Sequence, residues 1–401
     1  MATHTTRRAS FTVLVGSALG FGITLLLTPL ITRVFDPHVF GTFATITATA
    51  SVFVGVSTFR FEILAQRVES DNDARELLRL GLVSAIAWAL VASVVAWIAF
   101  LIWDINGWWL VTGVLILAGS LQLLGTAAMT RVRNYRRLAV SNFAQGAGLG
   151  VLQLLLGLYQ PTVGALVVGF GTARLAWLPS LRGTFRRGAA LATWREHWRF
   201  GRVAGTSGLV NSVAGQVPIL LTAVLYGDHI VGQLAIAIRI LVAPLGIVGQ
   251  AVASANLGEI GRLLREHDPA AARWVKAGMR DLFLLGLIPC AIAGGLGSWL
   301  VPIVLGSEWR ESGSMVAVLS IGALAQFTAA PFSQLLNVAG RNAALMTWDV
   351  ARLVTLTVSI LVPWTLGLPP IWAIATYSAL LVALYIALGR IVIRAVAAPV
   401  E

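Results

Sequence analysis

The amino-acid sequence predicts an all-α integral membrane protein with about 12 transmembrane helices, and three observations indicate this fold class. The 401 residues are 57% hydrophobic and only 11% charged, with a mean hydropathy of +0.83, whereas an average soluble domain has about 25% charged residues. Apolar runs recur about every 33 residues, and each approaches the roughly 20 residues that cross a hydrocarbon core. Because backbone groups in lipid must be hydrogen-bonded internally, these runs should be helices.

The apolar runs form two halves of six. The predicted spans of the first half are residues 11–34, 39–62, 78–102, 108–130, 138–158 and 161–182. Those of the second half are residues 200–226, 229–257, 278–305, 313–337, 344–366 and 369–393. This pattern predicts an N-terminal six-helix bundle over residues 1–183, a cytoplasmic linker helix over 184–199 and a C-terminal six-helix bundle over 200–401.

A short internal repeat relates the two halves. The segment from Asp36 to Ala44, in the first external turn of the first half, parallels the segment from Asp228 to Ala235 in the second half. Because both halves start on the same side and contain six helices, we expect a pseudo-two-fold axis along the membrane normal. In the linker, Leu191, Trp194 and Trp198 share one helical face among arginines, which is typical of a helix lying on anionic lipid.

The net charge of +12 would suggest nucleic-acid binding in a soluble protein. Here most of the 29 basic residues lie in alternate loops, as cytoplasmic loops of membrane proteins do. The distribution therefore predicts a multi-pass protein of the cell inner (plasma) membrane, with both termini cytoplasmic and membrane lipids rather than nucleic acid as its surroundings.

The sequence offers little for catalysis. The single cysteine, Cys290, excludes an internal disulfide and a CxxC site. The polar residues of the short external loops show no acid, base or metal constellation; they are Asp36, His38, Asp104, Asp228, His229 and the segment 308–311. Lys276, the only lysine, follows no glycine-rich loop, so direct ATP coupling is not expected. We therefore predict a protein that is not an enzyme and has no catalytic residue, metal site or cofactor.

Polar side chains recur at helical spacing within several apolar runs, and small residues or proline share some of these helix faces. They include Ser17, Thr24, Thr28 and Thr32; Ser207, Asn211, Pro218 and Thr222; Thr42, Thr45, Thr49 and Arg60; Gly232, Ala235, Arg239, Ala243, Gly246 and Gln250; Gln326, Ser333 and Asn337; and Asp349, Arg352, Thr355 and Ser359. Together these faces would wall a polar cavity. The alternative is that Ser, Thr and small residues only allow close helix packing.

Four arginines lie within predicted helices: Arg60, Arg174, Arg239 and Arg352. A central transmembrane arginine costs about 2.5–3.5 kcal/mol, so each is a candidate functional residue. Arg60 and Arg174 have the alternative of extending to the cytoplasmic surface, and Arg352 that of pairing with Asp349. An arginine facing a closed cavity favours an anion, and its planar fork matches phosphate oxygens.

Other polar residues complete the predicted site. Four amides are candidates for sugar hydroxyl groups, with helix-to-helix hydrogen bonding as the alternative; they are Asn211, Gln216, Gln250 and Gln326. Asp349 and Glu62 are candidate groups for coupling to an ion, again with a structural pair as the alternative.

Several stretches resemble the polysaccharide-biosynthesis, or Wzx-like oligosaccharide flippase, family of the multidrug/oligosaccharidyl-lipid/polysaccharide exporter superfamily. They are residues 30–43, 59–62, 216–221, 231–239, 245–250, 305–310 and 335–341. The resemblance implies two six-helix bundles with an alternating-access cavity lined largely by the first two helices of each half. It also implies translocation of undecaprenyl-diphosphate-linked oligosaccharide for O-antigen, capsule or exopolysaccharide assembly, with a polysaccharide polymerase among the partners.

Two other functions remain open at this point. A multidrug-type exporter of the same superfamily would share the fold, although the run from Phe11 to Val34 contains no carboxylate for a cationic drug. A membrane glycosyltransferase or ligase would share the substrate, but the short external loops do not favour it.

Overall fold

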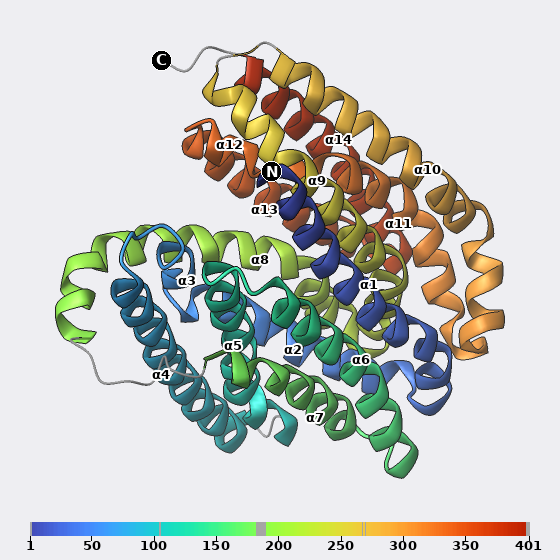
Figure 1. Cartoon of the computed structure of the whole chain (residues 1–401). Helices are drawn as coiled ribbons and strands as arrows, with labels where there is room; N and C mark the ends of the chain where they lie inside the picture. Colours follow the sequence, from blue (N-terminus) through green and yellow to red (C-terminus); the bar gives the residue numbers. More distant parts are fainter. Residues whose placement is uncertain (1, 104–105, 182–189, 267, 269, 398–401) are drawn as a thin grey trace. The chain divides into compact units, whose positions relative to one another are not determined.

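The computed structural model describes residues 2–103, 106–181, 190–266, 268 and 270–397, without the side chains of residues 2–11, 190–195, 203, 207, 253–259, 261, 262, 265, 338 and 342. Every regular element in these ranges is a helix (Figure 1). The first elements are α1 (Ala2–Val34), α2 (Pro37–Ser57), α3 (Phe61–Leu64), α4 (Asp71–Trp103), η1 (Gly107–Val111), α5 (Thr112–Arg131), α6 (Tyr135–Tyr159), α7 (Val163–Ala173) and η2 (Arg174–Leu181). They are followed by α8 (Ala190–Ala237), η3 (Ile238–Val242), α9 (Ala243–Arg265), α10 (Ala270–Leu305), η4 (Ser307–Trp309), α11 (Arg310–Ala329), η5 (Ala330–Phe332), α12 (Leu335–Val338), α13 (Asn342–Thr365) and α14 (Pro370–Ala397).

The helices confirm the predicted fold class. Within the described residues, 11 stretches are long and apolar enough to cross a membrane. One of them, Glu196–Val252, has 57 residues and would be about 86 Å long as a single helix, far more than one crossing needs. Gly227 breaks it with non-helical dihedrals, φ 83° and ψ 173°. Two crossings meet there, as predicted, and about 12 transmembrane helices result.

Large apolar side chains are exposed along the helices that the sequence places in lipid. Leu101 and Trp103 of α4 are 62% and 71% exposed, and Ile288 and Trp299 of α10 are 70% and 65% exposed. A soluble monomer rarely exposes such continuous apolar surface. A hydrocarbon environment explains these side chains.

The chain packs as two compact units. We call Val15–Leu220 the first unit, and Leu221–Glu401 together with Met1–Leu14 the second unit. The bundle boundaries at residues 183 and 200 remain predictions. Most of the proposed linker helix over 184–199 lies outside the residues, or the side chains, that the structure describes.

Each unit repeats one arrangement of helices. In the first unit α4 has 33 residues and is followed by the 3₁₀ turn η1 and the 20-residue α5. In the second unit α10 has 36 residues and is followed by the 3₁₀ turn η4 and the 20-residue α11. The internal repeat seen in the sequence therefore extends to the order and length of the helices.

A buried hydrogen-bond network fixes the η4 turn of the second unit. Gln233 Nε2 donates to the Glu308 carbonyl oxygen at 2.6 Å, and Ser312 Oγ donates to Gln233 Oε1 at 2.6 Å. Gln233 is fully buried. Two of the stretches that resemble the flippase family, 231–239 and 305–310, therefore meet in space.

In the first unit, the polar face of α1 packs against α6. Thr24 Oγ1 donates to the Gly146 carbonyl oxygen at 2.5 Å and accepts from the Gly150 amide at 3.1 Å. Thr28 and Thr32 are also buried and donate to carbonyl groups of α1 itself. The prediction that this stripe walls a cavity is wrong for these three threonines, because all three are buried. At Thr24 the small residues Gly146 and Gly150 let α6 pack closely against α1.

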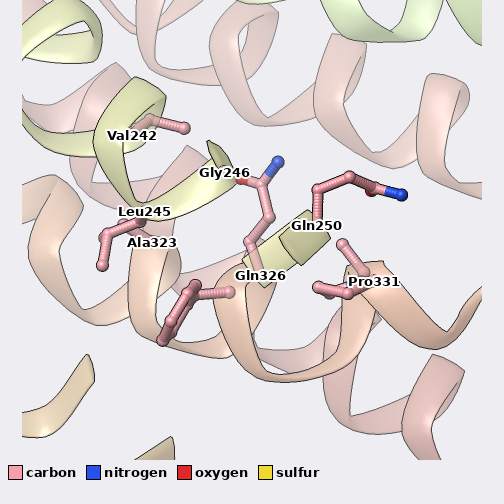
Figure 2. Close-up of a pocket in the computed structure, with 9 residues that line it drawn as sticks. Val242, Leu245, Gly246, Gln250, Ala323, Gln326 and Pro331 are labelled. Atoms are coloured by element: carbon pink, nitrogen blue, oxygen red, sulfur yellow. The ribbon is translucent and has the colours of Figure 1, made fainter. Parts of the chain in front are cut away.

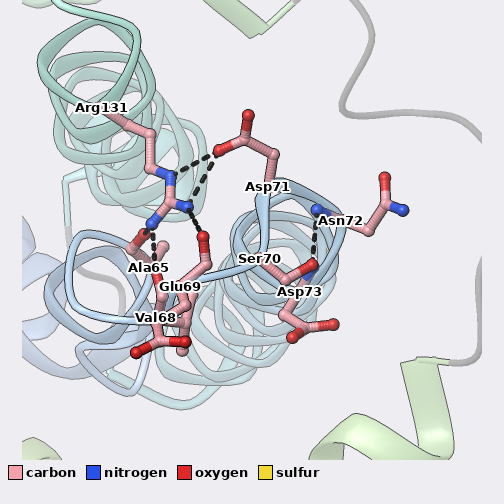
Figure 3. A network of polar contacts seen from close by, with 8 residues as sticks. All are labelled: Ala65, Val68, Glu69, Ser70, Asp71, Asn72, Asp73 and Arg131. Carbon is pink, nitrogen blue, oxygen red and sulfur yellow. Dashed lines mark hydrogen bonds and ion pairs between the residues drawn. The ribbon is translucent and has the colours of Figure 1, made fainter.

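Arg131 at the end of α5 fixes the segment between α3 and α4 (Figure 3). Its Nη1 donates to the carbonyl oxygens of Ala65 and Val68, and its Nη2 to that of Glu69. Nε and Nη2 both donate to Asp71 Oδ1, at 3.1 and 2.9 Å. All three nitrogens of this guanidinium are therefore engaged by the fold.

Candidate transport site

A pocket in the second unit brings two predicted site residues together. It has a volume of about 140 Å³, roughly ten times what one water molecule needs. Figure 2 shows Gln250 of α9 and Gln326 of α11 among the residues around it. The lining residues are Val242, Leu245, Gly246, Gln250, Ala323, Gln326, Phe327, Ala330 and Pro331. None of them is charged.

Glycines of α9 give the pocket its shape. A Cβ added at Gly246 would meet no atom within 4 Å, whereas one at Gly249 would lie 3.0 Å from Pro331 Cγ and 3.1 Å from Phe327 Cδ2. Gly249 therefore lets α9 approach α11 and η5, and Gly246 leaves open space beside the two amides. The result is an apolar floor under two groups that both donate and accept hydrogen bonds.

A π turn precedes the pocket. Ile238–Val242 forms i to i+5 hydrogen bonds between α8 and α9, and such turns often occur at functional sites. The turn takes up about one extra residue, so it rotates the preceding residues relative to α9. This rotation explains why Val242 lines the pocket while the half-buried Arg239, predicted on the same face as Gln250, is absent from its lining.

Arg174 of the first unit is placed at the junction of α7 and η2. Its guanidinium carbon lies 3.7 Å from the centre of the Phe170 ring, and Nη1 reaches the Phe170 carbonyl oxygen at only 3.4 Å. Nε is buried with no hydrogen-bond partner in the described part of the chain. The guanidinium therefore packs against its own helix, one turn back.

Arg60 sits at a strained corner between α2 and α3. Phe59 and Arg60 both have left-handed backbones, with φ 48° and 59°, and consecutive non-glycine residues rarely adopt this conformation. The Arg60 guanidinium lies against Gly208 of α8, where any Cβ would collide with Nε. Gly201 and Gly205 of the same helix face receive Phe59. The glycines at 201, 205 and 208 of α8 therefore leave the space in which Phe59 and Arg60 pack.

The two candidate coupling residues have structural partners. Arg352 Nη2 lies 3.3 Å from Asp349 Oδ1, the guanidinium carbon is 4.8 Å from the Trp348 ring centre, and Arg352 also hydrogen-bonds Tyr385. The paired alternative raised for Arg352 is therefore what the structure shows. Glu62 is buried at 5% exposure and accepts a hydrogen bond from Thr58 Oγ1 at 2.6 Å.

The remaining predicted amides lie in the first unit. On α8, Asn211 is exposed and Gln216 is half-buried, and neither lines the Gln250 and Gln326 pocket of the second unit. No cluster of three or more His, Cys, Asp or Glu side chains that could hold a metal ion occurs among the described residues.

Two parts of the site were not predicted from the sequence: the apolar half of the pocket and the glycines of α8 against which Arg60 packs. Phe327 and Pro331 follow Gln326 at positions one and five residues later, a spacing that carries no distinctive signal. The glycine stripe at 201, 205 and 208 does carry one, because spacings of four and three residues place small side chains on one helix face.

Comparison with known proteins is consistent with this architecture. A family model described as "Polysaccharide biosynthesis protein" matches residues 7–257. A search of curated protein sequences finds no match. The fold resembles an inward-facing multidrug resistance MATE family transporter of the MOP superfamily, with 15% identity, a TM-score of 0.66, and 96% of this chain and 95% of that chain covered.

Two further solved structures extend the likeness. A MOP superfamily transporter from Pyrococcus furiosus, described as having a binding pocket of reversed polarity, gives 14% identity and a TM-score of 0.59 over 98% of this chain and 96% of that one. The MATE transporter ClbM in complex with Rb⁺ gives 12% identity and a TM-score of 0.55 over 97% and 94%. At these identities the likeness shows the fold alone.

Proposed function

Because the chain belongs to the polysaccharide biosynthesis protein family, we propose that it moves undecaprenyl-diphosphate-linked oligosaccharide across the inner membrane. The cargo is an O-antigen, capsule or exopolysaccharide repeat unit that enters from the cytoplasmic leaflet and leaves in the periplasmic leaflet by alternating access. Both termini lie in the cytoplasm, and a polymerase receives the cargo. The protein acts as an exporter and makes or breaks no covalent bond.

One observation carries this proposal. The pocket between α9 and α11 presents the amides of Gln250 and Gln326 and no charged side chain among its nine lining residues. Amides donate and accept at once, as sugar hydroxyl groups do, and the Phe327 and Pro331 floor supplies an apolar surface for the face of a sugar ring. An organic cation would be bound better by a carboxylate, which this lining lacks.

The multidrug alternative shares the fold, and fold alone does not select a cargo. The neighbours described as multidrug resistance transporters share at most 15% identity with this chain. The polarity of the site must therefore decide. Arginine outnumbers carboxylate among the predicted site residues, and Arg352 already has Asp349 as its partner. This balance favours an anionic cargo over a cationic one.

In the proposed mechanism, each part of the cargo meets a matching environment. The diphosphate contacts the intramembrane arginines of each unit in turn, Arg60 and Arg174 of the first unit and then Arg239 of the second. The sugars occupy the amide-lined pocket, and the polyprenyl chain stays in lipid. A charge held by arginine forks is not exposed to hydrocarbon as it crosses, which removes most of the barrier to unassisted flipping.

Leaflet exchange in liposomes tests the proposal. Purified protein is reconstituted with a fluorescent undecaprenyl-diphosphate oligosaccharide, and an impermeant quencher reports the label in the outer leaflet. We expect wild type to accelerate exchange, and the double variant Gln250→Ala/Gln326→Ala to slow it by about thirtyfold, the loss expected for two hydrogen bonds at about 1 kcal/mol each.

Gln160→Ala is the matched control, because this exposed glutamine lies at the end of α6 and its loss should leave the rate unchanged. Equal exchange rates for the pocket variant and for wild type would remove the pocket from the mechanism. No exchange by wild-type protein under any ion gradient would contradict the proposed function.

A further inference from the structure

Arg174 lies near the middle of its membrane crossing. The span Val163–Leu181 consists of 11 residues of α-helix followed by eight of 3₁₀ helix. At 1.5 and 2.0 Å per residue these measure about 16 Å each, and Arg174 is the first residue of the second part. Similar lengths of helix therefore lie on either side of Arg174 within the span.

The surroundings of Arg174 are aromatic. Phe170, under its guanidinium, makes an edge contact with Phe43 of α2 at 5.6 Å between ring centres, and Phe43 makes another with Phe40 at 5.6 Å. The cation–π contact stabilises the guanidinium through its face. It leaves Nε, on the hydrogen-bonding edge of the guanidinium, without a partner in the described part of the chain.

Two other arginines differ from Arg174 in what they contact. All three guanidinium nitrogens of Arg131 donate to three carbonyl oxygens and Asp71. Arg352, whose Nε is also buried without a hydrogen bond among the described residues, has the counter-charge of Asp349 at 3.3 Å. Arg174 forms no ion pair in the described part of the chain, and its only hydrogen bond there is the 3.4 Å contact to its own helix. Its Nε is buried without a partner.

A buried cation without a counter-charge is strongly unfavourable, by several kcal/mol. A protein can keep such a cation where a bound ligand offsets the cost of burying it. Ionisable residues inside the membrane therefore often mark substrate pathways. The ligand must be anionic and must present oxygens in the plane of the guanidinium, since Phe170 covers one of its faces. A phosphate or diphosphate ester has this geometry, and two parallel hydrogen bonds hold it.

We infer that Arg174, held flat by Phe170, is a diphosphate-binding side chain of the first unit. The inference rests on the proposed function for the identity of the cargo, but the site itself requires only a phosphate ester. Arg174 is half-buried as a whole, so part of the side chain is accessible. Its Nε is buried and has no hydrogen-bond partner in the described part of the chain. Phe170 is a positioning residue, because its ring lies under the guanidinium one helical turn back.

Ligand binding to the purified full-length protein in detergent tests the site without any transport step. The three probes are undecaprenyl diphosphate, inorganic diphosphate and phosphatidylglycerol, each titrated against wild type, Arg174→Gln and Arg136→Gln. Arg136 is exposed in the first turn of α6, so Arg136→Gln removes the same charge elsewhere. We expect Arg174→Gln to weaken undecaprenyl diphosphate binding at least tenfold and Arg136→Gln to change it less than twofold.

Thermal unfolding of the ligand-free protein separates a binding residue from a structural one. Removing an uncompensated buried cation should leave the Tm of Arg174→Gln equal to wild type or higher, whereas loss of a structural arginine would lower it. Phe170→Leu should weaken undecaprenyl diphosphate binding without lowering the Tm by more than a few degrees. A lower Tm for Arg174→Gln with unchanged binding would overturn the inference.

The three probes also separate the sources of the phosphate. Weaker binding of inorganic diphosphate by Arg174→Gln shows that the head group alone is recognised, which supports the site. Binding of phosphatidylglycerol that depends on Arg174 as strongly as binding of undecaprenyl diphosphate does would identify an annular phospholipid contact and overturn the cargo site.

Flipping measurements separate a failure of the site from a failure of the proposed function. If wild type flips the oligosaccharide and Arg174→Gln binds and flips it equally well, the site is wrong and the function stands. If wild type does not flip it but binds diphosphate through Arg174, the site stands and the proposed function is wrong.

Discussion

Arg131, Arg174 and Arg352 differ in the groups that surround their guanidinium, and therefore in their roles. Arg131 is satisfied by the backbone of one segment, and Arg352 is neutralised by a carboxylate one turn away. Arg174 has an aromatic ring beneath it and no counter-charge in the described residues. The environment, not the residue type, determines which of them is free to bind an anion.

The Asp349 and Arg352 pair should behave as one unit. Both side chains are nearly buried, at 11% and 13% exposure, so Asp349→Ala or Arg352→Met alone leaves an unpaired charge and should destabilise the protein by about 3 kcal/mol. The double variant should lose less than either single one. Denaturant unfolding in detergent measures this double-mutant cycle.

Asp281→Ala provides the control for that cycle, because Asp281 pairs with Arg280 while both are more than half exposed. Such a pair contributes at most about 1 kcal/mol. Additive effects of Asp349→Ala and Arg352→Met would show that the contact between them has no energetic weight.

Arg131 should be irreplaceable by lysine. An ammonium group cannot reproduce the planar fork that reaches three carbonyl oxygens and Asp71, so Arg131→Lys should loosen the segment from residue 65 to 71. Arg67 is exposed in this segment, and trypsin should cleave after it several-fold faster in the variant because local opening becomes easier. Arg136→Lys should leave the cleavage rate at that bond unchanged, and an unchanged rate in Arg131→Lys would show that the network does not hold the segment.

At the scale of helices, close contact between α1 and α6 depends on missing side chains. A Cβ at Gly146 would lie 2.6 Å from the backbone of Gly20, whereas a Cβ at Gly22 would meet nothing within 4 Å. Gly146→Ala should therefore destabilise the protein by about 1–3 kcal/mol through overpacking. Gly22→Ala should be neutral or stabilising by up to about 1 kcal/mol, from helix propensity alone.

Thermal unfolding in detergent compares these two glycine variants directly. Both are Gly→Ala changes in helices of the first unit, so they differ mainly in the space around the new methyl group. A similar change in Tm for the two would contradict the packing described for α1 and α6.

Helix positions could be read from the sequence, but helix faces could not. Hydropathy predicts the crossings because every apolar run long enough for lipid must form a helix. Thr24 and Gln250 then belong to similar stripes in the sequence, yet Thr24 packs against α6 and Gln250 lines a pocket. The π turn at Ile238–Val242 shifts a face by one residue, and hydrophobic periodicity does not reveal such a shift.

At the scale of the molecule, the fold and the charge pattern carry different information. The solved structures of similar fold are at most 15% identical to this chain, so they show the fold alone and leave the cargo to be decided by the side chains. The partners of most arginines could not be predicted from the sequence. They lie on other helices, or their contact depends on the rotamers of neighbouring side chains. The pair of Asp349 and Arg352 is the exception, because their spacing of three residues predicts a contact on one helix face.

The central claim is that the cargo is a lipid-linked sugar and not an organic cation. The most direct measurement places both in the same liposomes, with a quencher-accessible fluorescent undecaprenyl-diphosphate oligosaccharide in the membrane and a fluorescent organic cation in the lumen, and follows both signals with and without the protein. The account predicts faster leaflet exchange of the oligosaccharide and no protein-dependent movement of the cation. Movement of the cation with no acceleration of oligosaccharide exchange would contradict it.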